Sequence, residues 1–168
     1  YVISKPDFLN AFKLSVFVTV VGTLFAMFLT VLTAYPLSKP SLRGRKFFLG
    51  IFVFIMLFGA GMVPNYILYR SLHLTNTVWA LVFSGAFSVF NLFIVKNYYE
   101  SLPETVEEAA RIDGASNLVT LFRIVLPMSM PVLATVTLFY GVSYWNSYFS
   151  GVMYITDPSL KSLQQYLY

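Results

Sequence analysis

The apolar stretch from residue 12 to about residue 37 restricts the fold of this chain more than any other feature. After Lys13 it contains no charged residue, and its Ser and Thr hydroxyls can bond back to their own helix. About 20 mostly apolar residues suffice to cross the hydrocarbon core of a bilayer as a helix. Lys13 can extend its amine from the end of such a span to the interface. The stretch therefore predicts a transmembrane helix.

Three further apolar stretches run from residue 47 to about 69, from 77 to about 95 and from about 128 to about 148. Gly59, Gly61 and Pro64 interrupt the far end of the first of these. Backbone groups freed at membrane depth must be satisfied by packed protein or by water. That end therefore either packs in a bundle or beside a water-filled path, or is a plain helix kink. The sequence predicts an all-α polytopic transmembrane bundle with four spans.

The composition argues against a soluble globular protein. Hydrophobic residues make up 58% of the chain and charged residues 11%, whereas soluble domains average about 25% charged residues. There is no Cys, and His73 is the single His, so neither disulfides nor a multi-His metal site is expected. No Ser/His/Asp constellation points to an enzyme. The basic residues lie in short connections rather than on one face, so nucleic acid is not expected as a partner.

The distribution of Lys and Arg predicts the orientation in the membrane. With four spans, the connection at 38–46 and the segment between the third and fourth spans lie on one side. Seven basic residues fall on that side and four on the other: Lys39, Arg43, Arg45, Lys46, Lys96, Arg111 and Arg123 against Lys5, Lys13, Arg70 and Lys161. Cytoplasmic loops carry the excess of Lys and Arg. We expect both connections in the cytoplasm and both chain ends outside.

No Asp or Glu lies within the four apolar stretches. Ion-coupled carriers usually place ionisable groups there, because the coupled charge needs a partner at low dielectric. The chain also lacks a G-x-x-x-x-G-K-[ST] loop for ATP phosphates. If the chain moves a solute uphill, its energy must therefore arrive from a partner through a cytoplasmic surface.

The segment from residue 101 to 131 is the largest such surface, and it reads as two short helices joined by a tight turn. Ser101 and Glu104 predict a capping box, with Pro103 in the first helical turn. Gly114 suits the left-handed position that ends a helix. Ser116 can cap a second helix that runs to about residue 123.

A face of small and apolar side chains follows these two helices. Its members are Ala109, Ala110, Leu118, Leu121 and Phe122. Helix caps and the helix dipole explain why acidic residues gather at the start of the first helix, but they do not explain this face. The segment is either a solvated loop stabilised by its own caps or, as we prefer, a docking surface for a partner.

The residues of this segment resemble the EAA signature of ATP-binding-cassette importer permeases. The matching positions, at the signature's fixed spacing, are Glu108, Ala109, Ala110, Gly114, Ile124, Leu126 and Pro127. The fuller run EEAARIDGAS…FRIVLPMSMPVL is similar to the carbohydrate branch, and most to the smaller maltose-type permease subunit. The run AYPLSKPSLRGRK resembles the basic turn after the family's second span.

The resemblance implies a type I permease fold over residues 1–168, with a cytoplasmic EAA coupling loop at 101–127. Such permeases have six spans in their core. The chain starts without Met and ends without a stop pattern. We therefore expect a fragment, cut at both ends, that holds about four of the six spans.

The resemblance also implies the partners and the place of work. Two permease subunits pair with two ATP-binding cassette subunits and an extracytoplasmic solute-binding protein, in the cytoplasmic membrane of a prokaryote. ATP and magnesium belong to the partner subunit, so this chain is expected to bind no cofactor and to be no enzyme. By the resemblance, Glu108 is the polar contact to the ATPase, Ala109 and Ala110 allow close packing, and Gly114 makes the turn. Two further residues are supporting contacts, Arg111 and Asp113.

The expected function is the translocation of a carbohydrate, in particular an oligosaccharide, driven by the separate ATPase. The alternatives are an ion-coupled secondary carrier and a permease for a non-sugar solute. Polar or aromatic groups at membrane depth are the candidate solute contacts: Asn65, Asn91, Tyr144, Trp145 and Asn146. Aromatic faces stack on sugar rings and amides bond hydroxyls. An interfacial aromatic belt with interhelical hydrogen bonds explains them equally well, and the chain then contributes no solute contact.

Overall fold

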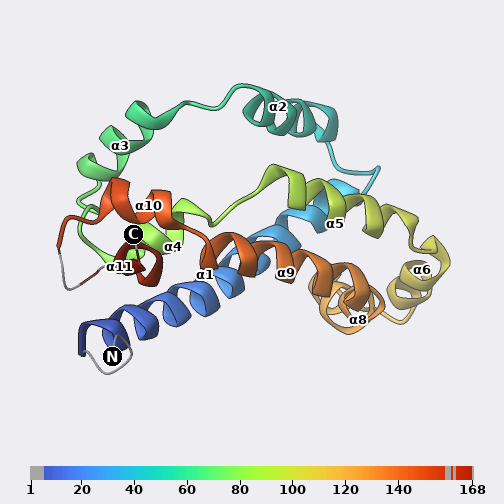
Figure 1. Cartoon of the computed structure of the whole chain (residues 1–168). Coiled ribbons are helices and arrows are strands. Elements are labelled where there is room, and N and C mark those ends of the chain that lie inside the picture. The colour runs from blue at the N-terminus through green and yellow to red at the C-terminus, as the bar shows by residue number, and fades with distance from the viewer. Residues whose placement is uncertain (1–5, 158–159, 161, 168) are drawn as a thin grey trace.

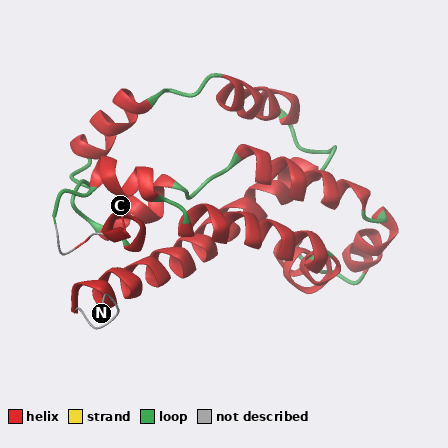
Figure 2. Cartoon of the chain, in the orientation of Figure 1, coloured by secondary structure: helices red, strands yellow, loops and turns green. Residues whose placement is uncertain are grey.

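A computed structural model describes residues 6–157, 160 and 162–167. All regular structure in these residues is helical (Figures 1 and 2). The elements are α1 (Pro6–Ser38), α2 (Arg45–Leu57), α3 (Met62–Ser71), α4 (Val78–Ser84), α5 (Val89–Ser101), α6 (Glu104–Ile112), α7 (Asn117–Thr120), the π-helix η1 (Leu121–Val125), α8 (Leu126–Met128), α9 (Met130–Trp145), α10 (Tyr148–Tyr154) and α11 (Leu163–Leu167). The predicted all-α fold is confirmed.

Helix α1, with 33 residues, is the axis of the molecule, and α5 and α9 pack along it (Figure 1). Ala26 and Ala34 of α1 are fully buried, and Leu92, Val95 and Val136 of the two neighbouring helices are buried against the same core. Lipid tails are as apolar as these side chains, so membrane helices associate through close van der Waals packing. Small residues on α1 permit that close approach.

Hydrogen bonds across the bundle satisfy the backbone where the third apolar stretch breaks. This stretch forms α4 and α5, which meet at an angle of 51°. The span predicted at 77–95 is therefore bent within its length, and its second helix continues to Ser101. The Tyr144 hydroxyl donates to the Val82 carbonyl oxygen at 2.6 Å. The Ser88 N–H donates to the Tyr140 hydroxyl oxygen at 3.1 Å, and that hydroxyl also bonds Thr30 at 2.7 Å. Side chains thus pair the groups that the break frees.

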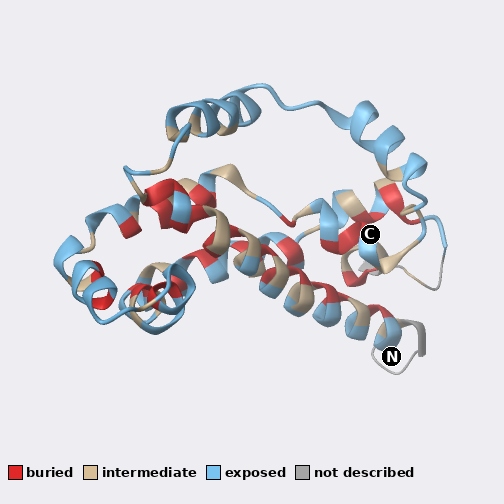
Figure 3. Cartoon of the chain, turned by 180° about the vertical axis from the view of Figure 1, so that it is seen from behind, coloured by how far each residue is buried: buried red, intermediate tan, exposed pale blue. Residues whose placement is uncertain are grey.

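The second apolar stretch is also broken. Helices α2 and α3 meet at 111°, and Gly61 between them has a φ of 82°. Neither helix contains a fully buried residue. Both lie at the edge of the molecule, where α2 contacts α5 and α3 contacts α10 (Figures 1 and 3). The stretch predicted as a span at 47–69 is therefore broken at its predicted interruption, and beyond the break Tyr69 of α3 stacks on Tyr154 of α10 with ring centres 4.4 Å apart.

The chain has four candidate membrane spans only if each pair of helices joined at a bend is counted as one span. Helix α1 is long and apolar enough by itself over Phe8–Ser38. Three bent pairs pass the same test together: α2 with α3, α4 with α5, and Asn117–Met128 with α9, the last bent by 84°. The fourth predicted span, 128–148, becomes α9, which begins at Met130 and ends at Trp145.

Asn76 connects two segments at the end of the molecule that holds α3, α4 and α10. Its side-chain oxygen accepts hydrogen bonds from the backbone N–H groups of Thr156 at 2.7 Å and Asp157 at 3.2 Å. Asn76 has a φ of 58°, a left-handed conformation that Asn tolerates better than most residues. The turn before α4 is thereby tied to the segment after α10.

Candidate coupling site

The first helix of the predicted docking segment is α6, but its start differs from the prediction. Ser101 is the last residue of α5, and its hydroxyl donates to the Tyr98 carbonyl oxygen at 2.7 Å. Pro103 occupies the N-cap of α6, with no side-chain capping bond. The predicted capping box with Glu104 is therefore wrong, because α5 continues through Ser101 and turns its hydroxyl toward its own helix.

The turn after α6 follows the prediction. Gly114 has a φ of 80°, in the left-handed region that favours glycine. The Ala115 N–H donates back to the Ala110 carbonyl oxygen at 2.9 Å, and the Gly114 N–H donates to the Arg111 carbonyl oxygen at 3.0 Å. This is the bonding that satisfies the last carbonyls of a helix. The Ser116 hydroxyl then accepts from the Val119 N–H at 3.4 Å and caps α7, as predicted.

The predicted small-and-apolar face is divided between two directions. Ala110 and Leu121 turn into the chain's own core. Ala109 is exposed on α6, and Leu118 and Phe122 are exposed on the next helical segment. Ile112, which the sequence analysis did not single out, is 87% exposed. An outward apolar surface therefore exists. It keeps Ala109, Leu118 and Phe122 of the expected face and adds Ile112.

The polar residue of the signature and its two expected supporting contacts lie on the outside of α6 and its turn. Glu108, Arg111 and Asp113 are all exposed. Glu107, their neighbour in the acidic run, is only 8% exposed and faces inward. A carboxylate removed from water needs a partner, so Glu107 and Glu108 have different roles despite being adjacent.

The second half of the segment winds continuously from Asn117 to Met128 through a π-helical turn. The predicted second helix, ending at about residue 123, is therefore too short. Pro127 has no N–H to donate to the carbonyl one turn earlier, which removes an α-helical bond from this stretch. Of the remaining signature residues, Ile124 and Leu126 are half-buried and Pro127 is exposed. Ser129 then separates this stretch from α9.

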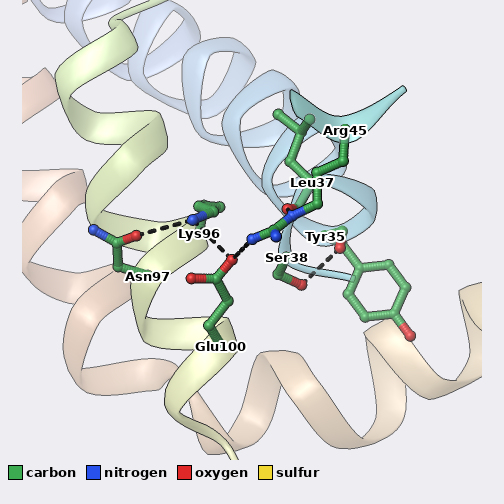
Figure 4. Close-up of polar contacts among 7 residues, drawn as sticks. All are labelled: Tyr35, Leu37, Ser38, Arg45, Lys96, Asn97 and Glu100. Atoms are coloured by element: carbon green, nitrogen blue, oxygen red, sulfur yellow. Dashed lines mark hydrogen bonds and ion pairs between the residues drawn. The ribbon is translucent and has the colours of Figure 1, made fainter. Parts of the chain in front are cut away.

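Two groups of ion pairs hold the connection after α1 against α5 and α6. Lys39 pairs with Glu107. Arg45 and Lys96 both pair with Glu100, the second at 2.7 Å. Figure 4 shows Arg45 reaching across from its own backbone to Glu100. Sequence reasoning missed these pairs, although the basic 38–46 connection and the i, i+4 spacing of Lys96 and Glu100 were visible.

A cleft of about 430 Å³ lies between this connection and α5–α6. Its walls carry charges of both signs, among them Arg45, Glu104, Glu108 and Arg111. Within the described residues, no three His, Cys, Asp or Glu side chains gather into a set that can hold a metal ion. With charges of both signs, the cleft suits contact with a charged surface of another protein.

The five candidate solute contacts do not form one site. Trp145 and Asn146 line a groove of about 550 Å³ between α1 and α9. Asn91 is buried beside a second hollow, of about 430 Å³, next to Tyr140. Tyr144 is buried and its hydroxyl is engaged by the backbone of α4. The fifth candidate, Asn65, is exposed on α3.

The groove beside Trp145 is mostly apolar, and the threonine hydroxyls of its α1 wall are buried behind its surface. The hydroxyls of Thr19 and Thr23 on α1 are buried without a hydrogen-bond partner in the described chain. The Asn146 amide donates to the Val142 carbonyl oxygen at 2.9 Å and so caps its own helix. Trp145 and Asn146 therefore line the same groove as Thr19 and Thr23, whose hydroxyls are buried.

Comparison with known proteins decides the family. Residues 7–166 match the family described as binding-protein-dependent transport system inner membrane component. The chain belongs to this family. Its membership confirms the resemblance read from the EAA signature and supports a membrane location.

Two relatives in this transport family come from Bacillus subtilis (strain 168). Protein LplC is 46% identical over 167 residues, which cover 99% of this chain and 57% of LplC. The polygalacturonan/rhamnogalacturonan transport system permease protein YtcP is 43% identical over 164 residues, which cover 98% of this chain and 57% of YtcP. The chain thus spans little more than half the length of these relatives.

A solved structure of another protein has the same fold as this chain. It is the crystal structure of a bacterial ABC transporter involved in the import of the acidic polysaccharide alginate. The TM-score is 0.96 at 37% sequence identity, covering 99% of this chain and 59% of the other. The fold is therefore that of an ABC importer permease, represented over part of its length.

Proposed function

We propose that the chain is part of the permease of an ATP-driven carbohydrate importer, with residues 101–127 as the loop that docks a separate ATP-hydrolysing subunit. The observation that carries the proposal is the outward surface of Glu108, Ala109, Ile112 and Leu118, presented on a helix and a tight turn. This surface lies at the end of the molecule far from α10 and α11 (Figure 1). An exposed apolar and acidic patch of this kind needs a partner to bury it.

The proposal assigns roles to the exposed residues of α6 and its turn. Glu108 makes the polar contact to the ATPase, and Arg111 and Asp113 support it. Ala109 lets the partner approach the α6 backbone closely, and Gly114 sets the direction in which α7 leaves. The partner subunit binds ATP and magnesium and hydrolyses the ATP. This chain responds to that reaction by moving and does not catalyse it.

The docking surface faces the cytoplasm in this proposal. The positions of Lys39, Arg45 and Lys96 support this orientation. Their ion pairs place all three basic side chains at the same end of the molecule as α6. Cytoplasmic surfaces carry the excess of basic residues. A second permease subunit and an extracytoplasmic solute-binding protein complete the transporter.

The proposed solute is a carbohydrate. Two similar proteins support this class: the solved ABC transporter is involved in alginate import, and YtcP is a polygalacturonan/rhamnogalacturonan transport permease. Among the five candidates, Trp145 and Asn146 are the proposed contacts, because both line one groove with an indole face and an amide. Asn91 is a second candidate beside its own hollow. We assign Tyr144 to the packing of α4 and leave Asn65, which stands alone on α3, outside the proposed solute path.

Glu108→Lys tests the docking role. In the full-length permease it reverses the charge of the proposed contact, so we expect the ATPase subunit to co-purify at least about tenfold less, in line with the loss of a charge-assisted contact. The amount of permease in the membrane should not change, because Glu108 makes no ion pair in the described chain. Ser71→Lys, at the exposed end of α3, is the matched control for adding a lysine. Normal retention of the ATPase by the Glu108→Lys complex would contradict the docking role.

A further inference from the structure

We propose that Lys39 and Glu107 form a link that carries movement of α6 directly to α1, so that both are positioning residues for energy coupling. This inference rests on the proposed function and adds a second route for the movement. The first route is the chain itself, from α6 through α7 and α8 to α9. The second route is the ion pair between Glu107 and the connection that follows α1.

Glu107 is held in place by its burial. It is the one strongly buried carboxylate among the three glutamates of α6, since Glu104 and Glu108 are exposed. Burial of a carboxylate is unfavourable unless a hydrogen-bonded opposite charge compensates it. Lys39 supplies that charge. The inward orientation of Glu107 is therefore bound to the position of Lys39.

Lys39 is in turn fixed to the end of α1. It follows Ser38, the last residue of that helix, and its backbone N–H donates to the Pro36 carbonyl oxygen at 3.1 Å. Its amine lies 4.7 Å from the centre of the Tyr35 ring. A cation over an aromatic face is attracted to it. The amine thus has two partners, one on α1 and one on α6.

The contacts of Arg45 hold the connection between α1 and α2 in place. Arg45 donates through Nε to the Leu37 carbonyl oxygen at 2.8 Å and pairs with Glu100 on α5 (Figure 4). Lys96 pairs with the same carboxylate. The connection is therefore anchored to α1 and α5, and a displacement of Glu107 reaches α1 without being absorbed by a loose turn.

Few other contacts join α6 to the bundle. The closest packing of α6 is against α7, and Ala110 is its only other buried residue. Among the described residues, Lys39–Glu107 is the ion pair that connects α6 with the α1 side. Because α1 packs along both α5 and α9, movement delivered to its end reaches the centre of the bundle.

The test uses the full-length permease in complex with its ATPase subunit and solute-binding protein, reconstituted in vesicles. Glu107→Gln and Lys39→Met each remove one charge, and we expect uptake per ATP hydrolysed to fall at least about fivefold, the scale of typical coupling between sites. The ATPase subunit should stay bound in both, because neither residue lies on the outward face. Arg43→Met, which removes an exposed charge from the same connection as Lys39, should leave the ratio unchanged.

Charge reversal separates a link from a general loss of packing. The double variant Lys39→Glu with Glu107→Lys rebuilds the pair and should recover at least half of the wild-type uptake per ATP. The inference is overturned if the single variants keep the wild-type ratio, if they release the ATPase as Glu108→Lys should, or if the reversed pair recovers nothing while its protein level is normal. Failure of the proposed function looks different, since the unmodified complex would then not bind the ATPase or take up carbohydrate.

Discussion

At the scale of single residues, the structure distinguishes neighbours that share a side-chain chemistry. Glu107 and Glu108 follow each other, yet one is buried against Lys39 and the other faces outward. The sequence predicts the acidic run and its place at the start of a helix. It does not predict which acid turns inward, because that depends on where the end of α1 lies in space.

Gly22 illustrates a residue requirement that only the packing reveals. A Cβ at Gly22 would lie 2.5 Å from Cζ of the Tyr144 ring, and one at Gly85 would lie 3.0 Å from the same atom. The ring is therefore held between two glycines, with its hydroxyl on the Val82 carbonyl. The ring has little room to move aside.

Gly22→Ala should therefore lower the thermal unfolding temperature of the detergent-purified protein. Overpacking of this kind costs about 1–3 kcal/mol. Gly50→Ala is the matched control, since Gly50 is also helical but has nothing within 4 Å of an added Cβ. The control should be neutral or slightly stabilising, because alanine favours a helix. Equal unfolding temperatures for the two variants would show that the ring is free to shift.

At the scale of the elements, the local signals in the coupling segment were strong enough to predict much of it. Gly114 marks the left-handed end of α6, and Ser116 marks the cap of α7. The start of α6 was missed because Ser101 satisfies both a capping pattern and the end of α5. The break between α2 and α3 falls at the interruption that Gly59 and Gly61 predict. The break between α4 and α5 was missed, since apolarity continues across it and its freed backbone groups bond to side chains of distant helices.

Tyr140 is the residue that joins three elements at one of these breaks. Its hydroxyl bonds Thr30 of α1 and accepts from the N–H of Ser88, the residue before α5. Tyr140→Phe leaves both of these groups without that partner in an apolar interior. Hydrogen bonds between membrane helices contribute about 1 kcal/mol, so a lower unfolding temperature in detergent is expected.

The control for this substitution is Tyr66→Phe on α3, where the side chain is exposed. It removes the same oxygen without touching the bundle, and its unfolding temperature should match that of the unmodified protein. If Tyr140→Phe is as stable as this control, the hydroxyl does not hold the break between α4 and α5 in place.

At the scale of the whole molecule, α2 and α3 present many apolar side chains outward. Figure 3 colours most of both helices as exposed. In water such a surface is a liability, whereas against lipid tails or other membrane helices it has no such cost. The four apolar stretches predicted from the sequence are all present as helices. Their arrangement around α1 could not be predicted, because each stretch is apolar on all sides.

The two ends of the molecule differ in their residues and contacts. The end at α6 gathers the ion pairs, the exposed signature residues and the charged cleft. The other end is closed by Asn76 and carries α10 and α11. Helix α1 runs between them, so it is the element through which an event at one end can affect the other.

Uptake of a labelled carbohydrate by vesicles that hold the full-length permease and its ATPase, with the solute-binding protein outside, tests this account most directly. A panel of neutral and uronate oligosaccharides covers the carbohydrate class. The account predicts accumulation that requires ATP inside the vesicle, continues when ionophores collapse all ion gradients, and is lost with Glu108→Lys. Accumulation that follows an ion gradient without ATP, or that Glu108→Lys leaves intact, would contradict it.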